Sequence, residues 1–67
     1  MEFSDRILSL REKKGVTQKA AAAAIGVTPR QYQRFEAGEQ KPGYDNLIAL
    51  ADYYNVSLDW LTGRSDV

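Results

Sequence analysis

The chain has 67 residues, enough for one small domain, whose folding buries only about 60% of the surface that the unfolded chain exposes. It contains no Cys and no His, which excludes a disulfide framework and a thiolate zinc site and removes the commonest general base. Because the acids are scattered along the chain, we expect neither an enzyme nor a cofactor or metal. The acidic start and the lack of a long apolar run argue against a signal peptide and a membrane span, so a cytoplasmic protein is expected.

The nine basic and nine acidic residues cancel in total but are unevenly distributed. Residues 6–34 carry seven Lys or Arg and one acid, whereas residues 35–67 carry six acids and two bases. Binding to DNA depends on the local field rather than on the net charge, so the basic segment favours a nucleic-acid partner. An ordinary mixed surface is the alternative interpretation.

Apolar spacing and capping residues predict the first two helices. Ser4 as N-cap, with Phe3 and Leu8 at the two positions of a hydrophobic staple, indicates a helix over 5–14 that ends at Gly15. A second helix is expected over residues 18–25, preceded by a capping Thr and followed by a Gly. Its run of alanines favours helix formation and lets a neighbouring helix approach closely.

The third helix has the strongest start signal. Thr28 is a preferred N-cap, Pro29 occupies the first helical position, and Gln31 is placed to complete a capping box. These signals predict a helix over 29–37, ended by Gly38.

Two more helices complete the chain and make the expected fold an all-α, compact bundle of five short helices. One is predicted over 44–54, and the other over 58–62, capped by Ser57 and ended by Gly63. Their predicted core residues are Leu47, Leu50, Ala51, Leu58 and Leu61.

The second and third helices are joined by the short turn IGVT, and a turn of this length containing Gly is typical of a helix-turn-helix corner. At helical spacing, Tyr32 and Phe35 point together toward the core. The opposite face then presents Arg30, Gln33, Arg34 and Ala37. Arg can read guanine and Gln can read adenine by paired hydrogen bonds, so this face is a candidate base-reading surface. A merely solvated polar face is the alternative.

In three segments the chain resembles the Cro/cI-type helix-turn-helix regulators, which are the phage repressors and bacterial relatives also called the XRE family: TQKAAAAAIGVTPRQYQRFEAG, the loop around Pro42, and LIALADYYNVSLDWLTG. The resemblance covers about residues 6–63. It implies a single lambda-repressor-like DNA-binding domain over 1–67, with the helix-turn-helix motif at about 17–37. It also implies a sequence-specific regulator of transcription, in the role of a repressor, that reads the major groove of double-stranded DNA with the 29–37 helix.

The resemblance carries functional roles onto individual positions. It implies that Gln18 binds a DNA phosphate and braces the reading helix, and that Lys41 lies in a loop beside the DNA backbone. It also implies a partly buried ion pair between Arg11 and Glu36, which would give both residues a structural role. The predicted DNA-binding set is Gln18, Lys19, Thr28, Pro29, Arg30, Gln31, Arg34 and Lys41.

Three departures from the family pattern bear on these roles. Pro29 supplies no side-chain donor where relatives often read a base, so recognition should rest more on the arginines. Ala37 replaces a polar residue that often contacts phosphate. Ala21 stands where the family usually has Leu, and we expect the large Tyr32 and Phe35 to refill that space.

We expect the working species to be a homodimer on a palindromic operator, because one helix-turn-helix unit reads only a few base pairs. Trp60 is a candidate interface residue, since aromatic residues are enriched at interfaces. Folding of Trp60 back onto the 44–54 helix is the alternative. Asp52 and Asp59 would repel across the contact, so we expect the dimer to form mainly on DNA.

A second function stays open on the same fold, namely a protein-interaction module of the co-activator, antitoxin or anti-repressor type. The acidic C-terminal half supports it, together with the aromatic residues Tyr44, Tyr53, Tyr54 and Trp60.

Overall fold

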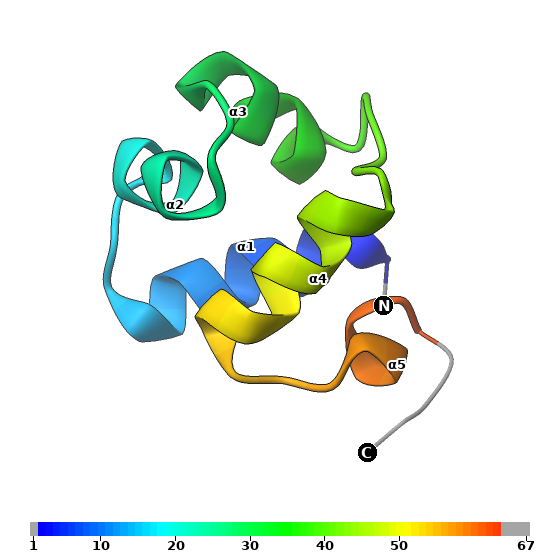
Figure 1. Ribbon diagram of the computed structural model, residues 1–67. Coiled ribbons are helices and arrows are strands. Elements are labelled where there is room, and N and C mark those ends of the chain that lie inside the picture. The colour runs from blue at the N-terminus through cyan, green and yellow to red at the C-terminus, as the bar shows by residue number, and fades with distance from the viewer. Residues whose placement is uncertain (1, 64–67) are drawn as a thin grey trace.

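The computed structural model describes residues 2–63 and contains, within them, five helices and no strand (Figure 1). The all-α fold predicted from the sequence is confirmed. The helices are α1 (Phe3–Lys14), α2 (Gln18–Ile25), α3 (Pro29–Ala37), α4 (Tyr44–Tyr54) and α5 (Leu58–Leu61). Among the described residues, no helix combines the length and the apolar character needed to cross a bilayer.

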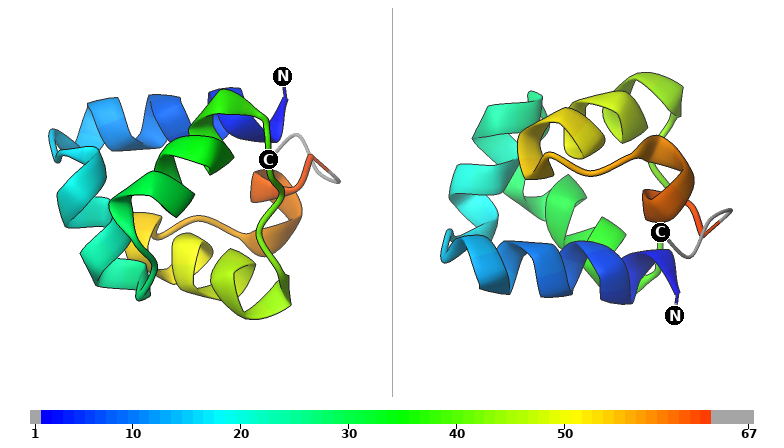
Figure 2. Two further views of the ribbon diagram at one scale, coloured as in Figure 1. Left: turned by 90° about the horizontal axis from the view of Figure 1, so that it is seen from above. Right: turned by 90° about the horizontal axis from the view of Figure 1, so that it is seen from below.

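The helices surround one core. α1 and α4 lie side by side, and α3 lies diagonally over them when the molecule is seen from above (Figure 2). α2 contacts both α3 and α4, while α5 packs against α1 and α4 on the far side from α3. One face of α3 is therefore turned toward the core and the other is turned outward.

Side-chain caps start three of the helices, as predicted. The hydroxyl oxygens of Thr17, Thr28 and Ser57 each accept a hydrogen bond from the backbone N–H three residues later, at 3.0, 3.1 and 3.0 Å. Each cap satisfies a helix N–H that has no partner within its own helix. Since the bonds are local, these helix starts are readable in the sequence.

The predicted start of the first helix is wrong. α1 begins at Phe3, and its N-cap is Glu2, whose side chain makes no capping hydrogen bond to the described residues. The backbone N–H of Arg6 donates to the carbonyl oxygen of Glu2 at 3.0 Å, which closes the first turn two residues early. Ser4 therefore lies inside the helix and is not its N-cap. Phe3 and Leu8 consequently do not occupy the two positions of a hydrophobic staple. Phe3 packs against the core instead.

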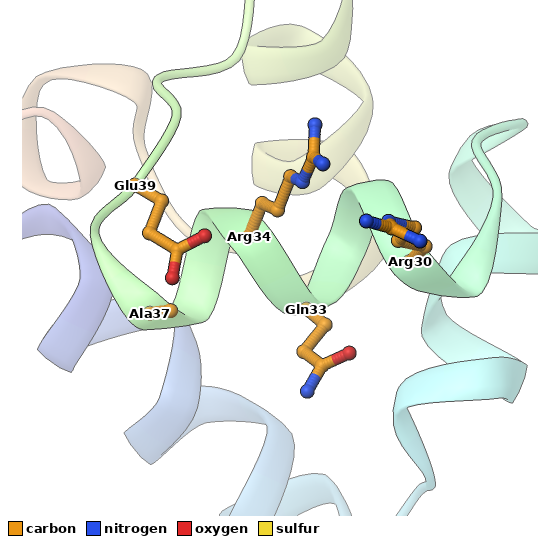
Figure 3. A pocket seen from close by; sticks show the side chains of 5 residues that line it. All are labelled: Arg30, Gln33, Arg34, Ala37 and Glu39. Carbon is orange, nitrogen blue, oxygen red and sulfur yellow. The ribbon is translucent and has the colours of Figure 1, made fainter.

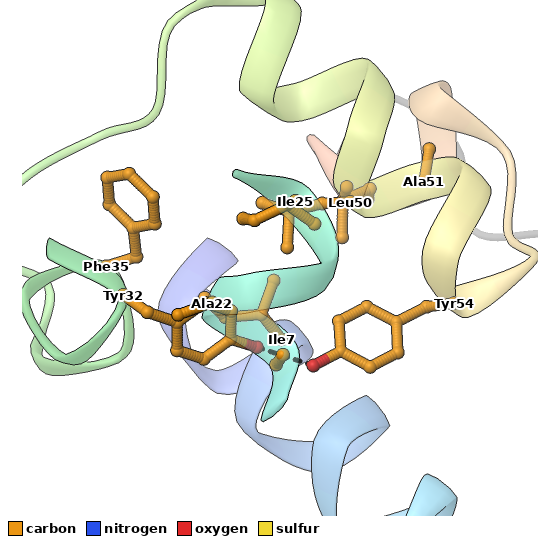
Figure 4. Packing of buried hydrophobic residues seen from close by; sticks show 10 residues of the cluster. Ile7, Ala22, Ile25, Tyr32, Phe35, Leu50, Ala51 and Tyr54 are labelled. Atoms are coloured by element: carbon orange, nitrogen blue, oxygen red, sulfur yellow. Dashed lines mark hydrogen bonds between the residues drawn. The ribbon is translucent and has the colours of Figure 1, made fainter. Parts of the chain in front are cut away.

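The core contains the small and large residues expected from the departures above (Figure 4). Ala21 and Ala22 of α2 are fully buried, and so are Tyr32 and Phe35 of α3. The large aromatic side chains and the small ones thus belong to one buried cluster. The other buried hydrophobic residues are Ile7, Ile25, Leu50, Ala51, Tyr54 and Leu61.

Two predicted core residues are only half-buried. Leu47 lies at the edge of the core, where it lines a small hollow with Phe3 and Pro42. Leu58 packs against the cluster from the start of α5. Both residues lie in the first turn of their helices, where neighbouring helices cover a side chain from one direction only.

Candidate nucleic-acid interface

The corner between α2 and α3 is built by Gly26. Its φ of 79° lies in the left-handed region, which a glycine adopts without a Cβ penalty. The next N–H, that of Val27, then donates back to the carbonyl oxygen of Ala22 at 3.0 Å. The chain leaves α2 in a single tight turn, and Thr28 caps α3 directly afterwards. This geometry presents α3 at a fixed angle to α2.

The outward face of α3 carries the predicted base-reading side chains. Arg30, Gln33, Arg34 and Ala37 are all exposed, and together with Glu39 they line a shallow depression of about 220 Å³. Seen from outside, the side chains of Gln33 and Arg34 extend toward the two edges of this face, and Arg30 lies near the start of the helix (Figure 3). The surface is polar and open, as a surface that contacts the edges of bases has to be.

Glu39 was not predicted as part of this surface. Gly38 ends α3 with a φ of 77°, and the N–H of Glu39 then donates to the carbonyl oxygen of Arg34 at 3.0 Å. This turn brings a carboxylate to the end of a face that otherwise carries two arginines. A glycine C-cap followed by an acid is the sequence signal that could have revealed it.

The structure distributes the remaining predicted DNA-binding residues over three places: the first turn of α2, the start of α3 and the loop after α3. Gln18 and Lys19 form the first turn of α2, where Lys19 is exposed. Lys41 is exposed in the loop after α3 and lines the hollow beside Phe3, not the depression on α3.

At the start of α3, Thr28 and Pro29 are exposed and Gln31 is half-buried. Half of the expected capping box is present, since the N–H of Gln31 donates to the hydroxyl of Thr28. The return bond from the Gln31 side chain does not occur among the described residues.

A polar network joins α1, α2 and α3 behind the outward face. The Nε of Arg11 donates to Glu36 Oε2 at 2.6 Å, and Nη2 donates to Oε1 at 3.2 Å. Arg11 also donates to the carbonyl oxygen of Val16, at 3.0 Å. Gln18 Nε2 donates to Glu36 Oε1 at 2.9 Å. The side chain of Glu36 is 5% exposed and that of Arg11 18%, so the predicted ion pair is present and partly buried.

Electrostatics and packing agree on a structural role for this pair. The hydrogen bond to Glu36 is the largest influence on Arg11 and raises the pKa of its guanidinium. A paired guanidinium with three hydrogen bonds inside the protein has little freedom to reach outward. The hydrogen bond from Gln18 to Glu36 also joins the start of α2 to α3, the contact that a brace on this helix would need.

Trp60 lies against α1. The guanidinium carbon of Arg6 lies 4.7 Å from the centroid of the Trp60 ring, in a cation–π contact. Arg6 is buried and Trp60 half-buried, so one part of the ring is covered from within the chain.

Comparison with known proteins identifies the family and the fold. Residues 7–61 match the family model described as "Helix-turn-helix". The chain belongs to the helix-turn-helix family. The matched region includes all of α2, α3, α4 and α5, and therefore the corner, the outward face and the polar network of this helix-turn-helix domain.

Curated relatives confirm the resemblance to the Cro/cI-type regulators. The domain is 34% identical over 67 residues to the HTH-type transcriptional regulator ImmR of Bacillus subtilis, a match that covers 100% of this chain and 53% of ImmR. It is 34% identical over 64 residues to the cryptic phage CTXphi transcriptional repressor RstR of Vibrio cholerae, covering 96% of this chain and 57% of RstR. The chain spans about half the length of these relatives.

Solved structures show the same arrangement. The P22 c2 repressor, crystallised in complex with a synthetic operator, superposes with a TM-score of 0.92 at 28% identity, over 97% of this chain and 98% of that one. A transcriptional regulator from Listeria innocua superposes with a TM-score of 0.89 at 29% identity, over 98% of this chain and 62% of that one. The lambda-repressor-like fold expected from the sequence is thereby confirmed.

Proposed function

We propose that this helix-turn-helix protein is a sequence-specific regulator of transcription, in the role of a repressor, that reads the major groove of double-stranded DNA with α3. The observation that carries the proposal is the two-sided character of this helix. Tyr32 and Phe35 are fully buried, while Arg30, Gln33 and Arg34 are exposed together on the opposite face. Arg bonds guanine O6 and N7, and Gln bonds adenine N6 and N7, so this face has the chemistry for base recognition.

Other residues would position the protein without reading sequence. The start of α2 has free backbone N–H groups and a positive dipole end, which attract a phosphate, and Gln18 and Lys19 lie there. Lys41 in the loop after α3 would contact the backbone farther along. Thr28, Pro29 and Gln31 lie at the start of the reading helix, where close approach to the DNA is expected.

The proposal extends to a homodimer on a palindromic operator. A single reading helix covers only a few base pairs, whereas two helices related by a two-fold axis and about 34–36 Å apart read two half-sites. The P22 c2 repressor, with the same fold, is seen on a synthetic operator. We assign the dimer contact to the acidic C-terminal half, with Trp60 as its anchor, since part of the ring is left uncovered. A regulator of this kind is not catalytic and works in the cytoplasm.

Salt-dependent binding tests the function. A duplex selected from random sequence by the protein, and a scrambled duplex, are titrated over a range of salt concentrations. The logarithm of the binding constant should fall linearly with the logarithm of salt, with a slope of about −0.9 for each phosphate contact. A slope near zero, or equal affinity for the two duplexes, would overturn the proposal.

The dimer is tested on the same duplex. Sedimentation with and without DNA should show two chains per full palindrome, and a half-site should bind far more weakly. Trp60→Ala should weaken binding to the full site and leave the half-site affinity unchanged. One chain per full site, bound as tightly as to a half-site, would contradict the dimer.

A further inference from the structure

The amide of Gln18 is held from inside the domain. Its Nε2 donates to Glu36 Oε1 at 2.9 Å, and within residues 2–63 this amide makes no other side-chain hydrogen bond. Gln18 is half-buried, whereas Glu36 is nearly enclosed. The amide therefore lies at the boundary between a buried carboxylate and the solvent at the start of α2.

The chemistry of the two groups fixes which way the amide is turned. A carboxylate only accepts hydrogen bonds, so the NH2 group of Gln18 has to face it, and the amide oxygen would be repelled. The NH2 group has two hydrogens, and Glu36 takes one of them. The second hydrogen on the same nitrogen stays available to an acceptor that approaches α2 from outside.

The negative charge of the Glu36 carboxylate is already balanced inside the domain, so it does not need a second cation. Arg11 balances its charge through two hydrogen bonds, at 2.6 and 3.2 Å. An approaching phosphate thus meets an NH2 donor in front of a neutralised carboxylate. The hydrogen bond from Gln18 therefore joins the start of α2 to Glu36, near the end of α3.

We propose that Glu36 is a positioning residue for DNA binding: it holds the Gln18 amide with one N–H turned inward and the other free for a phosphate oxygen. This inference rests on the proposed function. It means that the buried ion pair of the fold also sets the geometry of a phosphate contact, through α2. Loss of Glu36 would then weaken binding to all sequences alike, because phosphates carry no sequence information.

The experiment replaces the ion pair without changing the net charge. The double variant Arg11→Met/Glu36→Met removes the acceptor of the Gln18 amide, and an apolar replacement of a buried pair is often neutral or stabilising. It is compared with Gln18→Ala and with the triple variant that combines all three changes. Tyr54→Phe is the stability control, since it disturbs the core but leaves Gln18 and Glu36 untouched.

Affinities for the selected and the scrambled duplex, measured over the same range of salt concentrations, separate positioning from stability. We expect Gln18→Ala and the double variant each to weaken binding by about fivefold at every salt concentration, the value of one hydrogen bond, and to keep the wild-type slope, because an uncharged amide releases no counterion from DNA. The triple variant should show no further loss, and Tyr54→Phe should keep the wild-type affinity. If Gln18→Ala costs the same affinity in both backgrounds, the positioning role is overturned while DNA binding stands. If wild type itself shows no salt-dependent binding, the proposed function fails and this inference fails with it.

Side-chain NMR of the wild type tests the geometry even if the double variant does not fold. Without DNA, one of the two Gln18 amide protons should exchange slowly with solvent and the other rapidly. On addition of the selected duplex, the second proton should become protected as well. Rapid exchange of both protons without DNA, or no change in either on binding, would overturn the proposal.

Discussion

The hydroxyl groups of Tyr32 and Tyr54 lie 2.5 Å apart in the interior of the domain and share a hydrogen bond (Figure 4). Tyr32 belongs to α3 and Tyr54 ends α4, so the bond ties the candidate reading helix to the far side of the core. The ring of Tyr53 packs edge-on against Tyr54, with 4.9 Å between centroids. Two polar groups are thus buried together, each satisfied by the other.

A double-mutant cycle on this pair should show strong coupling. Tyr32→Phe or Tyr54→Phe leaves one buried hydroxyl without a partner, which should cost about 1–3 kcal/mol of unfolding free energy. The variant with both changes should recover much of that loss, because no polar group is then stranded. Urea denaturation of the four proteins gives the coupling free energy. Additive losses would mean that water replaces the missing partner.

The same pair should make the domain sensitive to alkali. Burial, and then the hydrogen bond with Tyr54, raise the pKa of Tyr32 far above its ordinary value of 10.0, and burial also raises that of Tyr54. The folded state therefore keeps protons that the unfolded state releases. The stabilisation from these groups is fully present below pH 10 and is lost as the pH rises above it, by up to about 1.4 kcal/mol per hydroxyl for each pH unit.

The measurement compares unfolding free energies of wild type and Tyr32→Phe/Tyr54→Phe between pH 8 and pH 11. All other residues are the same in the two proteins, so the difference between the two curves isolates the buried pair. Parallel curves would contradict the prediction.

Arg30 and Arg34 should determine sequence preference. Arg30→Ala or Arg34→Ala is expected to cost about 1–3 kcal/mol on a selected site and to relax preference at one or two base pairs. Lys19→Ala is the matched control, because it removes the same charge from the start of α2, where a phosphate contact is expected. It should weaken selected and scrambled duplexes equally. If the arginine variants also weakened both duplexes equally, α3 would not be the reading helix.

Glu39 should oppose DNA binding. Its carboxylate lines the same depression as the two arginines and would approach the phosphates. Glu39→Gln should therefore tighten binding to every duplex at low salt by roughly 1 kcal/mol, or about fivefold. Asp45→Asn removes the same charge at the start of α4, outside that depression, and should change the affinity less. A loss of affinity confined to one base pair would instead make Glu39 a reader, since a carboxylate can accept from cytosine N4.

Local interactions explain which features were predictable. The caps at Thr17, Thr28 and Ser57 bond a group three residues away, and the burial of Tyr32 and Phe35 follows from helical periodicity. Such features need no knowledge of the rest of the chain. The same local reasoning predicted the wrong start for α1, because Ser4 is of a residue type that is preferred as an N-cap. Tertiary packing of Phe3 against the core competes with that local preference and accompanies a helix that begins two residues earlier.

The sequence by itself therefore determined the five helices, the corner at Gly26 and the outward face of α3, since each depends on contacts within a few residues. The family resemblance implied the pair of Arg11 and Glu36, but only the tertiary structure decided the other polar contacts between helices. Gln18 and Glu36 are 18 positions apart, and Tyr32 and Tyr54 are 22 apart. Whether such groups come within hydrogen-bond distance depends on how α2, α3 and α4 are placed against one another. Periodicity says which face of a helix is buried, but not which residue of another helix that face will meet.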